Sequence, residues 1–387
     1  MIKILLLIDY SSEFDRKLLR GLVQYSKENG PWLFYRLPSY YSAMHGEQGI
    51  LRWAKEWKAD AIIGQWNNDT IDLQKELNIP VVLQNYHHRS VTYSNLTGDY
   101  KGTGRMAAQF FAKRMFRNFA YFGVKGVVWS DERCEGYRQE VKRIGGEFFS
   151  FESDKQEDEI RMEASQWLQQ LPKPVALFCC DDAHALFISE TCKMTNIPIP
   201  EEIALLGVDN DELMCNISDP PISSIELEVE RGGYSIGRLI HQQIKKEHEG
   251  TFNIVINPIR IELRQSTEKH NIKDPYILEV VKYIESHYSS DLTIESLLAN
   301  IPLSRRNFEV KFKNALNTSI YQYILNCRCN HLADLLLTTD RPLADLAMEV
   351  GFTDYNNIAR IFKKFKGCSP IEYRQKKKIG RASCRER

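Results

Sequence analysis

Residues 343–365 read Leu343-Ala-Asp-Leu-Ala-Met-Glu-Val-Gly351-Phe-Thr-Asp-Tyr-Asn-Asn-Ile-Ala-Arg-Ile-Phe-Lys-Lys-Phe365. The first half predicts a short helix, because its apolar residues recur at helical spacing at Leu343, Leu346, Ala347 and Val350. Gly351 stands where a tight turn needs a positive φ, and Thr353 can cap a second, basic helix. A helix, a glycine turn and a basic helix are the parts of a helix-turn-helix unit.

A second unit of this kind is predicted near residues 292–313. Leu292 to Leu298 form its first helix, and Ser304 caps its second, which has the apolar residues Phe308 and Phe312. A long helix from about 319 to 337 would join the two units. Held rigidly, their second helices could enter successive major grooves about 34 Å apart on one face of a duplex. Double-stranded DNA is therefore the expected partner.

We expect the second helix of each unit to supply the DNA contacts. Residues predicted to read bases are Arg305, Arg306 and Asn307 in the first unit and Tyr355, Asn356, Asn357 and Arg360 in the second. Residues predicted to bind phosphate are Lys311, Lys363, Lys364 and Lys366. The alternative is a small helical bundle with exposed charges.

The order of the motifs favours DNA binding over a plain bundle. The run from Leu346-Ala347 through Gly351-Phe352 and Arg360-Ile-Phe362-Lys363 to Gly367-Cys-Ser369-Pro370-Ile-Glu-Tyr373-Arg374 resembles the signature of the AraC family of transcription regulators. The match spans some thirty positions, so it is more specific than a short motif. One departure is Ile358, where the family usually has an aromatic core residue, and a buried aliphatic side chain can fill that role.

Composition and charge fit a protein of more than one domain. The chain has 387 residues, 43% of them hydrophobic and 26% charged, as in globular proteins. Its net charge is zero, but residues 274–378 have fifteen Lys and Arg against twelve Asp and Glu, whereas residues 1–273 have 33 against 38. Basic residues thus gather with the helix-turn-helix units, as phosphate contacts require.

The cysteines and the apolar segments indicate a cytoplasmic protein. Nine cysteines without CxxC pairs, including the adjacent Cys179 and Cys180 in an apolar strand, suggest reduced thiols. The apolar start is short and ends at Asp9 without a small-residue cleavage site, so we interpret it as a buried strand. No stretch is long enough to span a membrane.

The first 265 residues alternate strands with amphipathic helices. Strands are predicted at 2–8, 61–64, 81–84, 119–122, 176–179 and 204–208. This alternation predicts α/β architecture with parallel sheets, and the number of strands favours two doubly wound lobes over one sheet. In such sheets ligands bind outside the carboxyl ends of the strands.

Polar residues follow nearly every predicted strand. A ring of carboxylates and amides around aromatic side chains suits a sugar, whose hydroxyls need hydrogen-bonding partners and whose ring packs on an aromatic face. For any single Asp or Asn, capping of the next helix is an equally good explanation. The ligand-binding residues predicted from this pattern are Asp9, Tyr10, Trp66, Asn67, Asp99, Asp181 and Asp209.

Residues 1–265 also resemble the sugar-sensing domains of the LacI/GalR family and the periplasmic sugar-binding proteins. Arg133-Cys-Glu-Gly136-Tyr137 matches the family's Arg-x-x-Gly-aromatic step, in which the arginine hydrogen-bonds the sugar. Asp181 and Asp209 fall on two further polar positions of the family, and Asp99, ahead of Gly102, on a third near the cleft. The resemblance therefore implies a two-lobed, periplasmic-binding-protein-like sensor.

A LacI-like sensor followed by an AraC-type DNA-binding domain is the layout of the xylose-operon regulators, which the chain resembles up to Lys378. The predicted parts are a sensor at 1–265, a linker at 266–274, a DNA-binding domain at 275–378 and a non-native tail at 379–387. The resemblance implies a homodimer that binds D-xylose and activates xylose uptake and catabolism genes, with RNA polymerase as a further partner. A different pentose or sugar is the alternative effector.

Three motifs point to other chemistry, and their context argues against it. Gly233-Tyr-Ser235-Ile-Gly237 has the pattern of a hydrolase nucleophile elbow but lies inside an amphipathic segment, where its small residues should let a helix pack closely on the sheet. Gly102-Thr-Gly104 lacks the setting of a dinucleotide fingerprint. His87 and His88 would point to opposite faces of a strand. We therefore predict no enzyme, no cofactor and no metal, and an α/β enzyme with a helical accessory domain is the remaining alternative.

Overall fold

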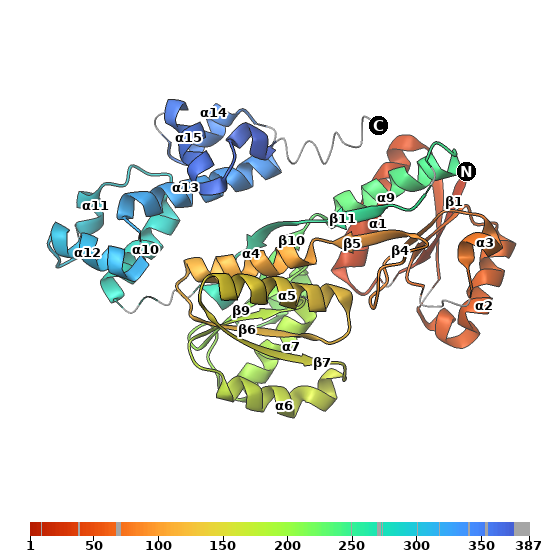
Figure 1. Cartoon of the computed structure of the whole chain (residues 1–387), viewed down its shortest axis with the longest axis horizontal. Helices are drawn as coiled ribbons and strands as arrows, with labels where there is room; N and C mark the ends of the chain where they lie inside the picture. Colours follow the sequence, from red (N-terminus) through yellow and green to blue (C-terminus); the bar gives the residue numbers. More distant parts are fainter. Residues whose placement is uncertain are drawn as a thin grey trace. The chain divides into compact units, whose positions relative to one another are not determined.

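The computed structural model describes residues 1–8, 10–37, 39–66, 71–248, 250–268, 272, 274–299, 301–316, 318–339, 341–352 and 355–374. They form two compact units, Met1–Lys269 and His270–Arg387. The predicted tail at 379–387 lies outside the described residues. Figure 1 shows a first unit built of sheets and helices and a second built of helices.

The first unit contains two six-stranded sheets. One has the order β11-β5-β4-β3-β1-β2, with all its strands parallel. Its strands are β1 (Ile2–Leu7), β2 (Trp32–Arg36), β3 (Ala61–Gly64), β4 (Val81–Leu83), β5 (Ser94–Gly98) and β11 (Asn253–Ile256). The helices of this lobe are α1 (Glu13–Asn29), α2 (Ser39–Trp57), α3 (Leu73–Leu77) and α9 (Val229–Ile244).

The other sheet has the order β12-β10-β9-β8-β6-β7, and only the pair β10 and β12 is antiparallel. Its strands are β6 (Asn118–Val124), β7 (Glu147–Ser153), β8 (Val175–Cys179), β9 (Ile203–Val208), β10 (Ser223–Leu227) and β12 (Pro258–Glu262). The helices of this lobe are α4 (Tyr100–Lys113), α5 (Val128–Arg143), α6 (Glu157–Gln170), α7 (Asp182–Met194) and α8 (Glu212–Ile217). The predicted two-lobed α/β architecture is thus confirmed.

The chain passes between the two sheets three times, after β5, after β10 and between β11 and β12. Each lobe is therefore made of segments that are distant in the sequence. The strands β2, β5, β7 and β10 to β12 were not predicted from the sequence. Several of these strands are partly exposed and mix polar with apolar residues, so they lack the continuous apolar run of a buried strand.

Two pairs of helices pack closely through glycines. A Cβ atom on Gly104 of α4 would lie 2.1 Å from the carbonyl oxygen of Arg133 in α5, so only glycine fits. A Cβ atom on Gly233 of α9 would likewise lie 2.1 Å from the carbonyl oxygen of Leu18 in α1. The Gly233–Gly237 motif therefore packs on a helix and not on the sheet, which corrects the prediction.

The second unit is helical, with α10 (Pro275–His287), α11 (Ile294–Leu298), α12 (Arg305–Leu316), α13 (Ile320–Thr338), α14 (Leu343–Glu349) and α15 (Tyr355–Lys366). The pairs α11 with α12 and α14 with α15 are the two predicted helix-turn-helix units, and α13 joins them (Figure 1). Gly351 has φ +89° between α14 and α15, as predicted. Thr353, the predicted cap of α15, lies outside the described residues.

The end of the first unit extends into the segment predicted as a linker. Ser266 and Thr267 are buried and lie in a short 3₁₀ helix, Gln265–Thr267. The hydroxyl of Ser266 donates to the carbonyl oxygen of Leu205 at 2.6 Å. These two residues are thus part of the first unit, because residues of the second sheet take up their hydrogen bonds.

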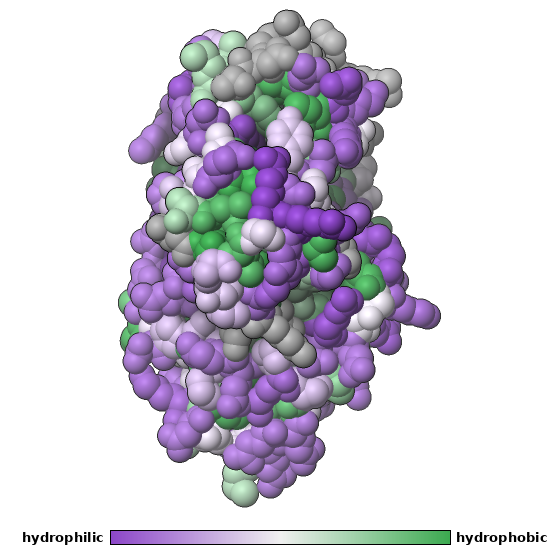
Figure 2. All heavy atoms as spheres, turned by 90° about the vertical axis from the view of Figure 1, so that its left-hand side faces the viewer, coloured by the Kyte–Doolittle hydropathy of each residue, from purple (hydrophilic) through white to green (hydrophobic). Residues whose placement is uncertain are grey.

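One face of the molecule (Figure 2) is mainly hydrophilic and most of the described cysteines are buried, as the composition of the chain predicts. Figure 2 shows one face of the molecule, on which hydrophilic side chains predominate and apolar side chains form separate groups. None of the eight cysteines that the structure describes forms a disulfide, and seven of them are buried. Within the described parts of the chain, no helix combines the length and apolar character that a membrane span requires.

Candidate functional site

The carboxyl edge of the second sheet brings three of the predicted ligand-binding residues together. Asp181 follows β8, Asp209 follows β9, and Arg133 reaches this edge from α5. Arg133 is 3% exposed, and its guanidinium donates to the carbonyl oxygen of Cys180. One guanidinium nitrogen lies 3.7 Å from Oδ1 of Asp209.

Aromatic rings surround this guanidinium. It lies 5.5 Å from the ring centre of Tyr100 and 5.4 Å from that of Trp129, within cation–π range of both. Tyr100 is the first residue of α4, two positions after the end of β5, and Trp129 is the second residue of α5. Burial raises the pKa of the Tyr100 hydroxyl, so it stays protonated and can donate a hydrogen bond.

Arg133 and Asp209 each have a buried polar atom that forms no hydrogen bond. Among the described residues, Nε of Arg133 and Oδ1 of Asp209 are buried and form no hydrogen bond. Burial raises the pKa of Asp209 to about 6, against the lowering effect of Arg133. A buried donor and a buried acceptor left open side by side can satisfy a ligand hydroxyl, which both donates and accepts.

Asp181 has local partners instead. Its Oδ1 accepts from the backbone N–H of His184 at 2.8 Å and lies 2.7 Å from Nδ1 of the same histidine, so it caps α7. Burial alone would raise the pKa of Asp181, but the neighbouring His184, mainly through its charge, lowers this pKa below its usual value. The other carboxylate oxygen of Asp181, Oδ2, is the atom that a ligand would contact.

Cys180, Asp181 and His184 also form a group whose ligand atoms lie within 4.8 Å of one another, a spacing that could hold a metal ion. Burial raises the pKa of the Cys180 thiol, so its metal-binding thiolate form is disfavoured. The nearby Arg133 guanidinium would also repel a cation. We assign no metal to this group.

The first lobe places its predicted residues less consistently. Trp66 is 4% exposed and packs in the apolar core of that lobe, with Nε1 donating to the carbonyl oxygen of Ile71 at 3.3 Å. It therefore presents little surface to a sugar. Tyr10 is partly buried, with the Arg36 guanidinium 5.0 Å from its ring centre. Asp9 and Asn67 lie outside the described residues.

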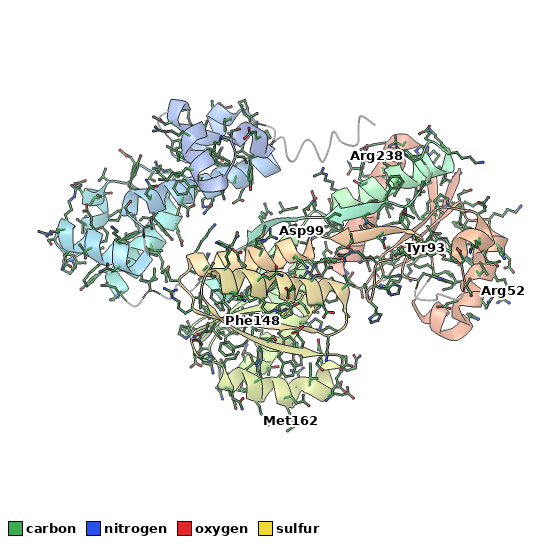
Figure 3. The ribbon with its side chains drawn as sticks, in the orientation of Figure 1. Arg52, Tyr93, Asp99, Phe148, Met162 and Arg238 are labelled. Carbon is green, nitrogen blue, oxygen red and sulfur yellow. The ribbon has the colours of Figure 1, made fainter. Side chains whose placement is uncertain are left out.

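Asp99 is exposed and caps α4, where its Oδ1 accepts from the backbone N–H of Gly102 at 2.8 Å. Figure 3 shows it at the start of that helix. Asp99 therefore caps a helix, which was the alternative to ligand binding for each predicted Asp. The next residue, Tyr100, reaches Arg133 instead, and the sequence signal that could have found it is an aromatic residue directly after a strand end.

Several interactions that were not predicted from the sequence connect the two lobes, among them the following three. Arg89, in the segment after β4, forms two hydrogen bonds with Glu132 of α5, at 2.7 and 2.8 Å. Nζ of Lys17 in α1 donates to the backbone oxygen of Asp209 at 2.7 Å. The backbone N–H of Val128 donates to the carbonyl oxygen of Tyr86 at 2.7 Å. These contacts hold the two lobes together in the arrangement that the structure has.

In α12 of the second unit, the predicted DNA contacts fall into two classes. Arg306 and Asn307 are exposed. Arg305 is exposed too, but its guanidinium pairs with Glu295 at 2.9 Å and with Glu309 at 3.2 Å. Lys311 pairs with the α10 cap Asp274 at 2.7 Å, so part of its role lies inside the unit.

In α15, Arg360, Lys363 and Lys364 are exposed, and Asn357 is partly buried. Nζ of Lys364 donates to the side chain of Gln322 in α13 at 2.8 Å. The side chains of Tyr355 and Asn356 lie outside the described residues. Ile358 is 1% exposed, which places an aliphatic residue in the core at that position.

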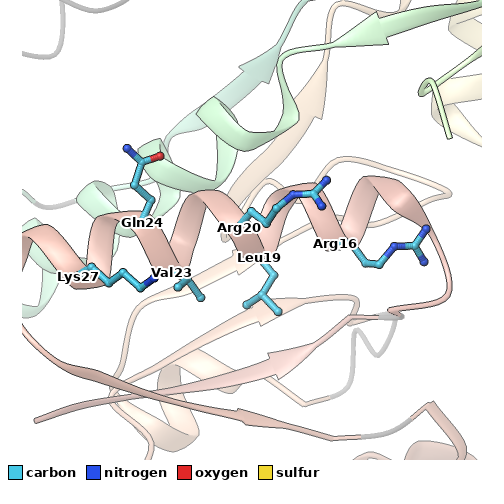
Figure 4. A pocket seen from close by; sticks show the side chains of 6 residues that line it. All are labelled: Arg16, Leu19, Arg20, Val23, Gln24 and Lys27. Carbon is cyan, nitrogen blue, oxygen red and sulfur yellow. The ribbon is translucent and has the colours of Figure 1, made fainter. Parts of the chain in front are cut away.

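Two surface hollows lie away from the edge where Arg133 meets Asp209. One, of about 430 Å³, lies along α1 with Leu19 and Val23 among its lining residues (Figure 4). The other, of about 720 Å³, lies between α1 and α8. Leu213 and Ile217 line it and are each 67% exposed. Neither hollow includes a predicted ligand-binding residue.

Comparison with protein families identifies a domain in each unit. Residues 108–267 match a periplasmic binding protein-like domain, and residues 297–376 match a helix-turn-helix domain. The first range covers the second lobe with Arg133, Asp181 and Asp209. The second covers α12 and α15.

Comparison with individual proteins covers nearly the whole chain. It is 24% identical over 385 residues to the xylose operon regulatory protein of Escherichia coli (strain K12), covering 96% of each. The namesake from Haemophilus influenzae is 24% identical over 386 residues, covering 96% of this chain and 98% of that protein. A solved structure of the xylose-binding transcription activator xylR matches with a TM-score of 0.59 and 22% identity, over 96% of this chain and 97% of that one. The chain is therefore similar to the xylose operon regulatory proteins along almost its whole length, and its two matched domains are a periplasmic binding protein-like domain followed by a helix-turn-helix domain.

Proposed function

We propose that this protein is a transcription regulator that binds DNA through α12 and α15 and responds to a sugar, D-xylose, held at Arg133 and Asp209. The observation that carries the sugar site is the pair of buried polar atoms at these two residues that form no hydrogen bond. Asp181, Tyr100 and Trp129 would complete the site with an oxygen, a hydroxyl and an aromatic surface.

D-xylose is the proposed effector because 96% of the chain matches xylose operon regulatory proteins. A pentose offers several hydroxyls to a donor and an acceptor that lie side by side, whereas an apolar ligand would leave both atoms unsatisfied. Another pentose is the second candidate, because Trp66, which was predicted to contact the sugar from the first lobe, packs in the core of that lobe instead.

The proposal includes a switch between two arrangements of the lobes. A sugar that binds beside these lobe-to-lobe contacts and favours them would stabilise the arrangement in which Arg89 meets Glu132 and Lys17 meets Asp209. A hundredfold preference for that arrangement supplies about 2.7 kcal/mol. This free energy would be available to change how the DNA-binding units are presented.

We further propose a cytoplasmic homodimer that activates xylose genes together with RNA polymerase and has no enzymatic activity. The exposed Leu213 and Ile217 on α8 support self-association, because apolar side chains grouped on a surface mark interaction sites. Ser235 of the hydrolase-like motif lies inside α9, a setting that cannot form a nucleophile elbow.

Thermal unfolding of the full chain, titrated with D-xylose, L-arabinose, D-ribose and D-glucose, tests the sugar assignment. At a hundred times its dissociation constant, the effector should stabilise the sensor by about 2.7 kcal/mol. The shift should vanish in Arg133→Ala and remain in Asp154→Asn, an exposed control. A shift with a different sugar would change the effector, and no shift with any sugar would remove the pentose assignment.

A further inference from the structure

The two DNA-binding helices carry the same apolar framework with a different residue at its centre. In α12, Phe308 and Phe312 are both 0% exposed, and Val310 lies between them. In α15, Ile358 and Phe362 are 1% and 0% exposed, with Arg360 in the equivalent place. Val310 and Arg360 are therefore counterparts in the two units.

Helix geometry places Val310 in the middle of the outward face of α12. At 100° per residue, a side chain two positions from each of two buried aromatics points away from both. Val310 is 52% exposed, and its neighbours on this face, Arg306 four residues before and Lys313 three residues after, are also exposed. A branched apolar side chain thus stands at the centre of a basic face.

The neighbouring charges make this apolar residue more prominent. Arg305 is held by Glu295 and Glu309, so it is turned from the centre of the face towards its own unit. The centre of the outward face of α12 is therefore the apolar side chain of Val310, flanked by Arg306 and Lys313. In the equivalent place, α15 offers a guanidinium followed by Lys363 and Lys364.

We propose that Val310 contacts the C5-methyl group of a thymine in the major groove, so that the first helix-turn-helix unit prefers a T·A pair where the second, through Arg360, prefers a guanine. The thymine methyl is the apolar group that the major groove presents, and arginine pairs with the O6 and N7 atoms of guanine. The two halves of the recognised DNA would then differ in sequence. This inference rests on the proposed DNA-binding function.

Uracil substitution tests the contact directly, because deoxyuridine differs from thymidine only by the C5-methyl group. The full chain, with D-xylose, is first used to select duplexes from a random library. Each thymine of the selected duplex is then replaced by uracil in turn, and affinity is measured at fixed salt. One replacement should weaken binding by about fourfold, the equivalent of one buried methyl group.

The same series is repeated with three variants. In Val310→Ala the sensitive position should become insensitive to uracil, whereas in Arg360→Ala it should stay sensitive and discrimination against a replaced guanine should fall. Val91→Ala, at a valine that is 94% exposed in the first unit, should behave as the unchanged protein does. Because Val310 is exposed, its replacement should leave the thermal unfolding of the chain unchanged.

Several results would overturn the assignment. If no uracil weakens binding, or if the loss persists in Val310→Ala, Val310 does not contact a thymine methyl, while the proposed DNA-binding function stands. If selection yields no preferred sequence and binding does not depend on salt, the DNA-binding function fails and takes this inference with it.

Discussion

A guanidinium nitrogen of Arg133 lies 3.7 Å from the carboxylate of Asp209, and both side chains keep a buried polar atom unbonded. Asp209 also has φ +99°, a backbone conformation that costs a non-glycine residue roughly 1–3 kcal/mol. The backbone strain and the buried atoms without hydrogen bonds both lower the stability of the free protein. A ligand hydroxyl that bonds these atoms would remove the cost of leaving them unsatisfied. This relationship distinguishes the candidate site from a carboxylate that only caps a helix, such as that of Asp99.

The raised pKa of Asp209, about 6, predicts a pH dependence of stability. Because this value lies above that of an unfolded aspartate, the folded state binds the proton more tightly. The contribution of Asp209 therefore favours folding at low pH and is lost as pH rises towards 6, by up to about 3 kcal/mol. Asp209→Asn should lose this component, so its stability relative to the unchanged protein should rise between pH 4 and 7 in denaturant titrations.

The ligand should reverse this effect, since a sugar hydroxyl that donates to Asp209 favours the ionised carboxylate. Affinity for D-xylose should thus increase between pH 5 and 7, with proton release in calorimetry. The exposed Asp154→Asn control should show the full pH dependence. Equal pH profiles for Asp209→Asn and the unchanged protein would show that another group titrates in this range.

Sequence patterns predicted the architecture because it depends on long, repeated signals. Apolar runs such as 61–64 and 203–208 are buried on both faces, and both helix-turn-helix units carry helical spacing and a turn. The site was harder, because side-chain direction is set by packing. Trp66 turned into an apolar core, and Asp99 turned to its own helix, while Tyr100 reached Arg133 from a position that no motif marks.

Lys311 should contribute more to folding than to DNA binding, because its Nζ lies 2.7 Å from Asp274. This hydrogen bond lowers the pKa of Asp274, so the pair stabilises the unit above the pKa of an unfolded aspartate and is lost on acidification. Lys311→Ala should cost within about 1 kcal/mol at pH 7, since both side chains are partly exposed. Scanning calorimetry of the full chain measures the loss. Lys313→Ala is the matched control, with unchanged stability and weaker DNA binding.

Gly351→Ala should destabilise the second helix-turn-helix unit. Gly351 has φ +89°, and a Cβ atom there would lie 2.6 Å from the carbonyl oxygen of Ser289. Gly367 has a similar φ, +78°, but open space around its Cβ position, so Gly367→Ala isolates the conformational cost of about 1 kcal/mol. Gly351→Ala should cost more by calorimetry and weaken DNA binding. Equal losses in the two variants would mean that the contact with Ser289 yields without strain.

Arg360 and Lys363 provide the test of which side chains read bases and which bind phosphate. Both are exposed on α15, but Arg360 lies opposite the buried Ile358 and Phe362, where a helix faces the floor of the groove. Arg360→Ala should cost about 1–3 kcal/mol on the selected sequence and little on others, because a bidentate contact to one base is lost. Lys363→Ala should weaken binding to all sequences alike and reduce the slope of log affinity against log salt by about one. Binding to selected and random duplexes over a series of salt concentrations separates the two effects. If both variants lower affinity uniformly and flatten the salt slope, Arg360 binds phosphate, and the guanine preference of the second unit must come from another residue of α15.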